Sequence, residues 1–104
     1  MSGSSAGGSP GYEPEMNCGS ISFNTDINSP QENTLAGLEV RQQLNVRLSD
    51  GVVVVVRTDT GDIVGSINWS SIAKLIECLS DGYEYVALIR DIQGGLIKVH
   101  ISAK

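Results

Sequence analysis

The amino-acid sequence predicts an α+β domain: a small, strongly bent antiparallel sheet or partly closed β-barrel of about six strands, with one amphipathic helix and a short helical turn. Short segments of alternating or continuous apolar residues recur along the chain, and turn signals separate them. Only one segment has strong helical periodicity, and no strand-helix-strand unit is repeated. An open sheet with the helix packed across one face is the alternative.

The chain has 104 residues and a mass of 11.0 kDa, which is enough for one hydrophobic core. Residues 1–15 combine small polar residues with two prolines and offer almost nothing to bury. Because ordering such a segment costs backbone entropy with little return, we predict a disordered tail over residues 1–15 and a single globular domain over residues 16–104.

The first elements of the domain are a strand and a helical turn. Residues 18–24 alternate, with Ile21 and Phe23 on one side, and predict a half-buried strand at a sheet edge. Residues 29–32 read Ser-Pro-Gln-Glu, a capping-box pattern with Ser at the N-cap. We expect one short helical turn there, stopped at Gly37.

A hairpin is predicted next. Residues 44–49 alternate between apolar and polar, and Asp50-Gly51 supplies a tight turn before Val52–Val56. Five consecutive valines are typical of a strand covered on both faces, such as a barrel wall. A second turn at residues 58–61 leads into a strand over residues 63–67.

Residues 70–80 predict the helix, with Asn68 as its cap and Gly82 as its stop. Residues 83–92 and 96–102 then form a closing hairpin around Gly94-Gly95. The helical face expected to be buried consists of Ile72, Leu75, Ile76 and Leu79, while Lys74, Glu77 and Ser80 face the other way.

Composition bounds the partners and the compartment. The formal net charge is −5, but residues 1–34 hold four acids and no base, which leaves eight acids and seven bases for the rest. Strong non-specific binding of nucleic acid needs a surplus of cations, and none exists here. No apolar run is long enough to span a membrane, so we predict no membrane association and a cytoplasmic protein, in which Cys18 and Cys78 are free thiols.

The sequence shows no complete catalytic or metal-binding set. His100 is the single histidine and is expected to be an exposed strand residue without an orienting acid. Cys18, Cys78 and His100 lack the fourth ligand and the close spacing of a structural zinc site. No glycine motif for phosphate binding is present, and we predict no catalytic residue, no metal and no cofactor.

Aromatic residues at the two helix ends are the candidate binding residues. Trp69 precedes the helix, and Tyr83 and Tyr85 follow it, so together they could stack a base or pack a partner peptide. The alternative, that Trp69 and one tyrosine complete the core, stays open at this point. Phosphate contacts in the same hypothesis would come from four cations on strands, namely Arg47, Arg57, Arg90 and Lys98.

Residues 52–89 resemble the second half of the HIRAN domain, a small β-barrel module. Residues 64–67 read V-G-S-I and match that family's V-G-x-[LI] element, and the apolar face of residues 70–80 matches its helix. The family's polar element, rich in Arg, Asn, Pro and Asp, has no counterpart in residues 43–51. The resemblance therefore implies the barrel, and the binding of single-stranded DNA ends by family members brings no contact residue with it.

Function is predicted as a ranking. The first expectation is a non-catalytic binding or interaction module that contacts an unidentified protein partner, because catalytic residues are absent and the folded part is near neutral. The alternative is a small barrel that binds single-stranded nucleic acid, and an enzyme of unknown class ranks third.

Overall fold

The computed structural model describes residues 17–104 of the chain. The tail predicted for residues 1–15 and the first residue of the predicted domain lie outside the described residues. From the N-terminus, the elements are η1 (Cys18–Ser20), β2 (Ser22–Asn28), η2 (Glu32–Thr34), β3 (Gln43–Ser49), β4 (Val52–Val56), β5 (Ile63–Ile67), α1 (Ile72–Ser80), β6 (Tyr85–Gln93) and β7 (Leu96–Ala103), where η denotes a 3-10 turn.

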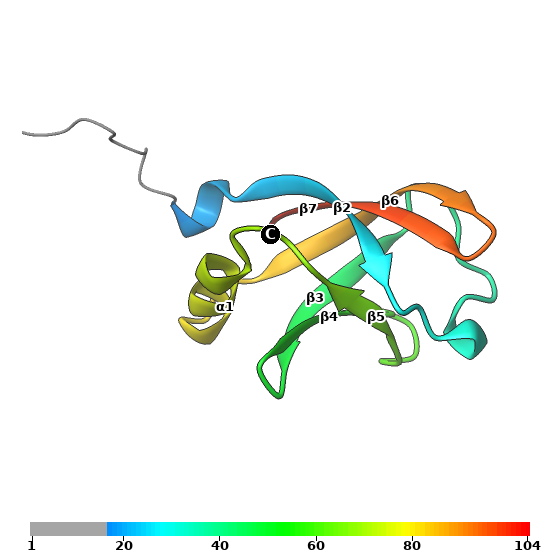
Figure 1. Ribbon diagram of the computed structural model, residues 1–104, viewed down its shortest axis with the longest axis horizontal. Coiled ribbons are helices and arrows are strands. Elements are labelled where there is room, and N and C mark those ends of the chain that lie inside the picture. The colour runs from blue at the N-terminus through cyan, green and yellow to red at the C-terminus, as the bar shows by residue number, and fades with distance from the viewer. Residues whose placement is uncertain (1–16) are drawn as a thin grey trace, which may run out of the picture.

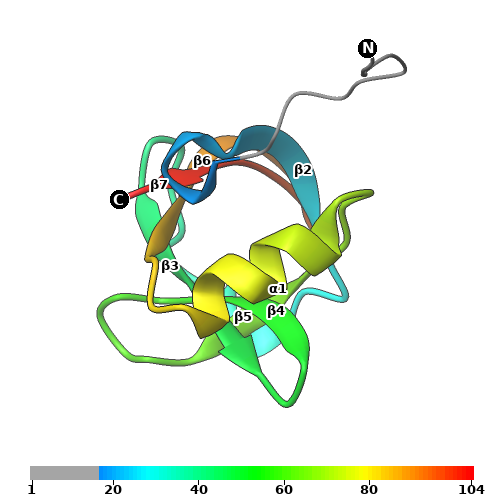
Figure 2. The same cartoon turned by 90° about the vertical axis from the view of Figure 1, so that its left-hand side faces the viewer.

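Six strands form a closed barrel in the order β2-β5-β4-β3-β6-β7, and every neighbouring pair is antiparallel (Figures 1 and 2). The predicted small α+β barrel is confirmed. The edge position predicted for the first strand is wrong, because β2 pairs with β7 on one side and β5 on the other. Closure satisfies the backbone groups that an edge strand would leave unpaired.

The β3–β4 hairpin is confirmed together with its turn. Asp50 and Gly51 have φ values of 50° and 79°, the left-handed pair that a two-residue hairpin turn requires. In β4, Val53 to Val56 are all buried, as expected for a barrel wall covered on both sides.

The helical turn predicted after β2 forms as η2, but its cap is different. Ser29 has a φ of 50° rather than the extended backbone of an N-cap, and Gln31 occupies the cap position. The reason is a tertiary contact, since the Gln31 N–H donates a 2.7 Å hydrogen bond to the carbonyl oxygen of Val64 in β5. This contact fixes the chain before the turn begins.

Gly65 allows this crossing of chains. Gly65 is a residue of β5 and lies opposite Val55 of β4. A Cβ at this position would clash with Ile27 Cγ2 and come within 2.7 Å of the Asn28 carbonyl oxygen. The glycine of the V-G-S-I segment is therefore required for close approach of backbone segments.

Helix α1 lies at one end of the barrel, and η2 lies at the other (Figure 1). The N-cap of α1 is Ser71 instead of the predicted Asn68, while Gly82, with a φ of 97°, ends the helix as expected. The Gly82 and Tyr83 N–H groups donate to the carbonyls of Leu79 and Cys78, which is a Schellman motif.

The predicted apolar face of α1 packs on the core, although only part of it is fully buried. Leu75 and Cys78 are buried, whereas the other three apolar residues of the face, Ile72, Ile76 and Leu79, are half-buried. A helix that lies at the barrel end presents only a narrow strip to the interior. Lys74 is half-buried and pairs with Glu77 at 2.9 Å.

The prediction of free thiols is wrong, because Cys18 and Cys78 form a disulfide. The fold brings η1 against the inward strip of α1, and this places two cysteines 60 residues apart in sequence side by side. The hydrophobic core beneath this disulfide runs through the barrel and includes Leu44, Val55, Ile89, Val99 and Ile101.

Candidate functional site

The three predicted aromatic residues do not form one groove. Tyr85 faces the interior, and its hydroxyl group donates a 2.6 Å hydrogen bond to the Cys18 carbonyl. Trp69 is half-buried and stacks on Phe23 with ring centroids 3.8 Å apart, so one face of its indole is covered. Tyr83 is 47% exposed and follows the opposite end of α1. The aromatic residues therefore mostly complete the core and its rim.

Arg57 has a structural role. Its side chain is only 12% exposed, and Nε and Nη2 donate to the two carboxylate oxygens of Asp59 at 2.9 Å each. Nη1 donates to the carbonyl oxygens of Thr34 and Ala36 at 2.9 and 2.6 Å. The guanidinium thus ties the segment after η2 to the β4–β5 turn, and its hydrogen bonds lower the pKa of Asp59 to about 2.

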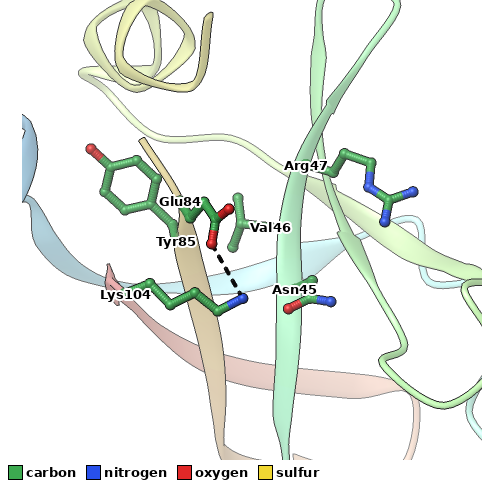
Figure 3. Close-up of a pocket in the computed structure, with 6 residues that line it drawn as sticks. All are labelled: Asn45, Val46, Arg47, Glu84, Tyr85 and Lys104. Atoms are coloured by element: carbon green, nitrogen blue, oxygen red, sulfur yellow. Dashed lines mark ion pairs between the residues drawn. The ribbon is translucent and has the colours of Figure 1, made fainter. Parts of the chain in front are cut away.

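Arg47 borders a small depression of about 190 Å³ between β3 and β6 (Figure 3). The depression also contains Glu84 and Lys104, whose charged groups lie 3.6 Å apart. In Figure 3 the Arg47 guanidinium points away from this pair. The acid and the amine compensate each other, which leaves the Arg47 guanidinium as the remaining charge at this depression.

Lys98 lies on the outer face of β7 beside a depression formed by Asn24, Thr25 and Asp26. In the sheet register it is opposite Asp26 of β2 and Asp91 of β6. Residues opposite each other share one face of a sheet, so Asp26 and Asp91 lie on the same face as Lys98. Lys98 is therefore poorly placed to contact a series of phosphate groups.

A third depression, of about 550 Å³, is formed by Val40, Arg41, Leu88, Ile89 and Arg90, and we call it the Arg41–Arg90 depression. Of the predicted site residues it contains only Arg90. Both arginines are exposed, as is Val40, which has 50% of its surface exposed. In residues 17–104, neither guanidinium has an ion-pair or hydrogen-bond partner. Asp91, next to Arg90 in sequence, instead accepts a 3.0 Å hydrogen bond from Gln93 Nε2.

Two backbone irregularities lie at residues that line this depression. Arg41 N–H donates to the Ile89 carbonyl at 2.7 Å, and Ile89 N–H donates to the Gln42 carbonyl at 2.9 Å. Arg41 and Gln42 therefore both lie opposite the single residue Ile89. This is a β-bulge whose first residue is normally glycine, and Arg41 adopts the glycine-like φ of 77°. On β6, the register with β7 shifts between Ile89 and Asp91, which places Arg90 at a second irregularity.

Sequence reasoning missed Arg41. Residues 38–44 contain no glycine or Asn-Gly pair that would indicate a left-handed residue, and its partner Ile89 lies almost fifty residues away. Only the strand register brings Arg41 beside Arg90.

His100 is held by two neighbours on β2. Its Nδ1 lies 2.8 Å from Asn24 Oδ1 and its Nε2 lies 2.9 Å from Ser22 Oγ. Because an amide oxygen only accepts, Nδ1 carries the proton, and a neutral ring then accepts from the Ser22 hydroxyl group. A nucleophile, a base and an orienting group follow this order in hydrolases. The trio lies on the outer barrel wall, however, and the three depressions described above contain neither Ser22 nor His100, so we interpret it as a cross-strand hydrogen-bond ladder.

No group of three or more His, Cys, Asp or Glu side chains that could hold a metal ion is found within residues 17–104. In the same part of the chain, no helix is long and apolar enough to cross a membrane. In comparisons with known proteins, no protein-family model, no curated protein and no solved structure matches the chain.

Proposed function

We propose that this chain is a non-catalytic binding module that acts through protein contacts, and that the Arg41–Arg90 depression is its binding surface. The observation that carries the proposal is a pair of guanidiniums beside the exposed Val40 side chain, neither of which has a partner in the part of the chain that the structure describes. Arginine next to apolar surface is the composition enriched at the energetic centres of protein interfaces. Of the other cations predicted from the sequence, Arg57 pairs with Asp59, and Lys98 lies opposite two acids in the sheet register. Arg47 borders the depression that already holds the Glu84–Lys104 pair.

Site-specific photo-crosslinking tests this proposal. A photoreactive phenylalanine analogue at Val40 should trap a partner protein in cells, and the adduct should disappear when Arg90→Gln is added. The same analogue at Val52, an exposed valine at the β3–β4 turn, is the matched control and should not give that adduct. The proposal is wrong if Val40 gives no adduct, or if both positions trap the same proteins.

Single-stranded nucleic acid remains the competing ligand class. It is supported by the partly exposed Trp69–Phe23 stack and by the resemblance to the HIRAN domain. Titration of Trp69 fluorescence with oligothymidylate at two salt concentrations separates the classes, because phosphate contacts give a salt-dependent affinity. Our proposal expects no change in fluorescence at low salt.

The disulfide bears on the cellular compartment of the protein. The sequence predicts the cytoplasm, whereas the Cys18–Cys78 disulfide favours an oxidising compartment, since cytosolic thiols are kept reduced. Mass spectrometry of protein alkylated during cell lysis decides between them. Two alkylated cysteines would support the cytoplasm, and an unmodified, disulfide-bonded chain would support an oxidising compartment.

A further inference from the structure

We infer that the Arg41–Arg90 depression binds a carboxylate of an extended acidic peptide, with an aliphatic side chain of that peptide packed on Val40 and Leu88. This inference rests on the proposed function and adds the chemistry of the partner. Its basis is the position of the two arginines, the backbone that carries Arg41, and the distribution of charge around them.

The position of the arginines fits a single anionic group. Arg41 and Gln42 both face Ile89, and Arg90 is the next residue after Ile89 on β6. Although Arg41 faces the buried Ile89 in the register, Arg41 and Arg90 both line this depression. Two guanidiniums beside one depression repel each other without an anion between them, and each can donate two parallel hydrogen bonds to a carboxylate.

The backbone of Arg41 gives an independent reason to connect it with binding. A φ of 77° is unfavourable for a residue with a Cβ, whereas glycine adopts it freely. The bulge itself therefore needs glycine rather than arginine. Strained residues of this kind are concentrated at functional sites, where the side chain has a role that offsets the backbone cost.

The surroundings favour a peptide over a nucleic acid. The walls of the depression are aliphatic, formed by Val40 and Leu88, and carry no aromatic ring on which a base could stack. The nearest cation along the outer face of β7, Lys98, lies on the same sheet face as Asp26 and Asp91. A nucleic-acid strand would meet these acids after its first phosphates, whereas an acidic peptide needs only one strong anionic contact with an apolar neighbour.

Fluorescence anisotropy of the oxidised full chain with a defined probe tests the inference. The probe is a fluorescein-labelled peptide of alternating glutamate and leucine, and the matched control peptide has glutamine in place of glutamate. We expect saturable binding of the first peptide at low salt and at least tenfold weaker binding of the second. Arg41→Gly and Arg90→Gln should each weaken the first by at least tenfold, while Arg47→Gln, on a different depression, should have no effect.

A stability measurement separates a binding role from a structural one. Because glycine relaxes the backbone, Arg41→Gly should unfold at the same urea concentration as the natural chain or at a higher one. Weaker binding together with unchanged or higher stability supports the inference. If Arg41→Gly lost both affinity for the peptide and stability, Arg41 would have a structural role. Arg90→Gln would then have to lose affinity without losing stability for the inference to stand.

Three results would overturn the inference: no binding of the glutamate peptide, equal binding of the glutamine peptide, or tighter binding of oligothymidylate than of either peptide through the same arginines. Failure of the peptide to bind, with an Arg90-dependent adduct still formed at Val40 in cells, would leave the proposed function intact and exclude only the acidic ligand. Loss of both peptide binding and the Val40 adduct would also exclude the Arg41–Arg90 depression as a binding surface.

Discussion

The hydroxyl group of Tyr85 and the carbonyl oxygen of Cys18 are joined by a hydrogen bond of 2.6 Å, which links β6 to the turn that carries the disulfide. Burial also raises the pKa of Tyr85, so the neutral, donating form is favoured in the folded state. Tyr85→Phe should lower the free energy of unfolding by about 1 kcal/mol, because the carbonyl loses its partner.

Urea unfolding at pH 7 measures this loss. Tyr83→Phe is the matched control, since Tyr83 is exposed and its hydroxyl group has no hydrogen-bond partner among the described residues. Equal effects of the two substitutions would contradict the assignment of Tyr85 as the structural tyrosine.

Removal of the disulfide should have a larger effect. Cys18 and Cys78 close a loop of 60 residues, and cross-linking a loop of that length restricts the unfolded chain by about 4 kcal/mol in the chain-entropy model. The double variant Cys18→Ala/Cys78→Ala should therefore unfold at a much lower urea concentration than the oxidised chain. Dithiothreitol should destabilise the natural chain and leave the double variant unchanged; the same response in both would argue against the disulfide.

Gly65→Ala should destabilise the barrel where β5 passes the end of β2. A Cβ at Gly65 meets Ile27 Cγ2 and the Asn28 carbonyl, and the Gln31–Val64 hydrogen bond holds the two chain segments together there. Overpacking of this kind typically costs about 1–3 kcal/mol.

Gly95→Ala is the control for this substitution, because a Cβ at Gly95 would have no neighbour within 4 Å and its φ is not in the left-handed region. Thermal unfolding of both variants should show a lower midpoint only for Gly65→Ala. A comparable shift for Gly95→Ala would mean that the close approach at Gly65 is not the cause.

Acid should weaken the link between the β4–β5 turn and the segment after η2. The pKa of Asp59 is about 2 in the folded state, below its unfolded value of about 4, so its contribution is complete above about pH 4 and is lost as the pH falls toward 2. The difference in unfolding free energy between the natural chain and Asp59→Asn should shrink over that range.

The Arg57→Gln background is the control for the acid experiment. Without the guanidinium, the pKa of Asp59 loses the largest of the effects that lower it and keeps only the smaller ones of the Asp59 and Thr60 backbone N–H groups. Asp59→Asn should therefore change the pH profile much less in this background. If the pH dependence of the difference persisted undiminished in this background, its source would lie outside the Arg57–Asp59 pair.

The fold could be predicted from the sequence where the determining pattern is local. The Asp50-Gly51 turn, the valine strand and the Gly82 stop each depend on residues within a few positions of one another, and all three are confirmed. Closure of the barrel is different, since β2 must find both β5 and β7. β7, the partner strand that is most distant from β2 in sequence, is identified only by the strand register. The sequence therefore predicted β2 at a sheet edge.

The candidate site could be predicted only in part for the same reason. Arg90 was expected on a strand face, but its neighbour Arg41 depends on a bulge opposite Ile89 that no local signal indicates. Arg57 was expected to meet phosphates, whereas two carbonyls and Asp59 already use its donors. Sequence identifies which side chains can bind anions, and the register decides which of them are still available.

The face of α1 provides the last prediction. Leu75 has no exposed surface and points into the barrel end, so Leu75→Ala should lower the free energy of unfolding by about 2–5 kcal/mol. Ile76→Ala should cost less, because Ile76 is only half-buried. Lys74→Ala should cost below about 1 kcal/mol, since Lys74 pairs with the largely exposed Glu77. Urea unfolding of the three variants should follow this order, and a Lys74→Ala variant as unstable as Leu75→Ala would show that α1 presents a different face to the barrel.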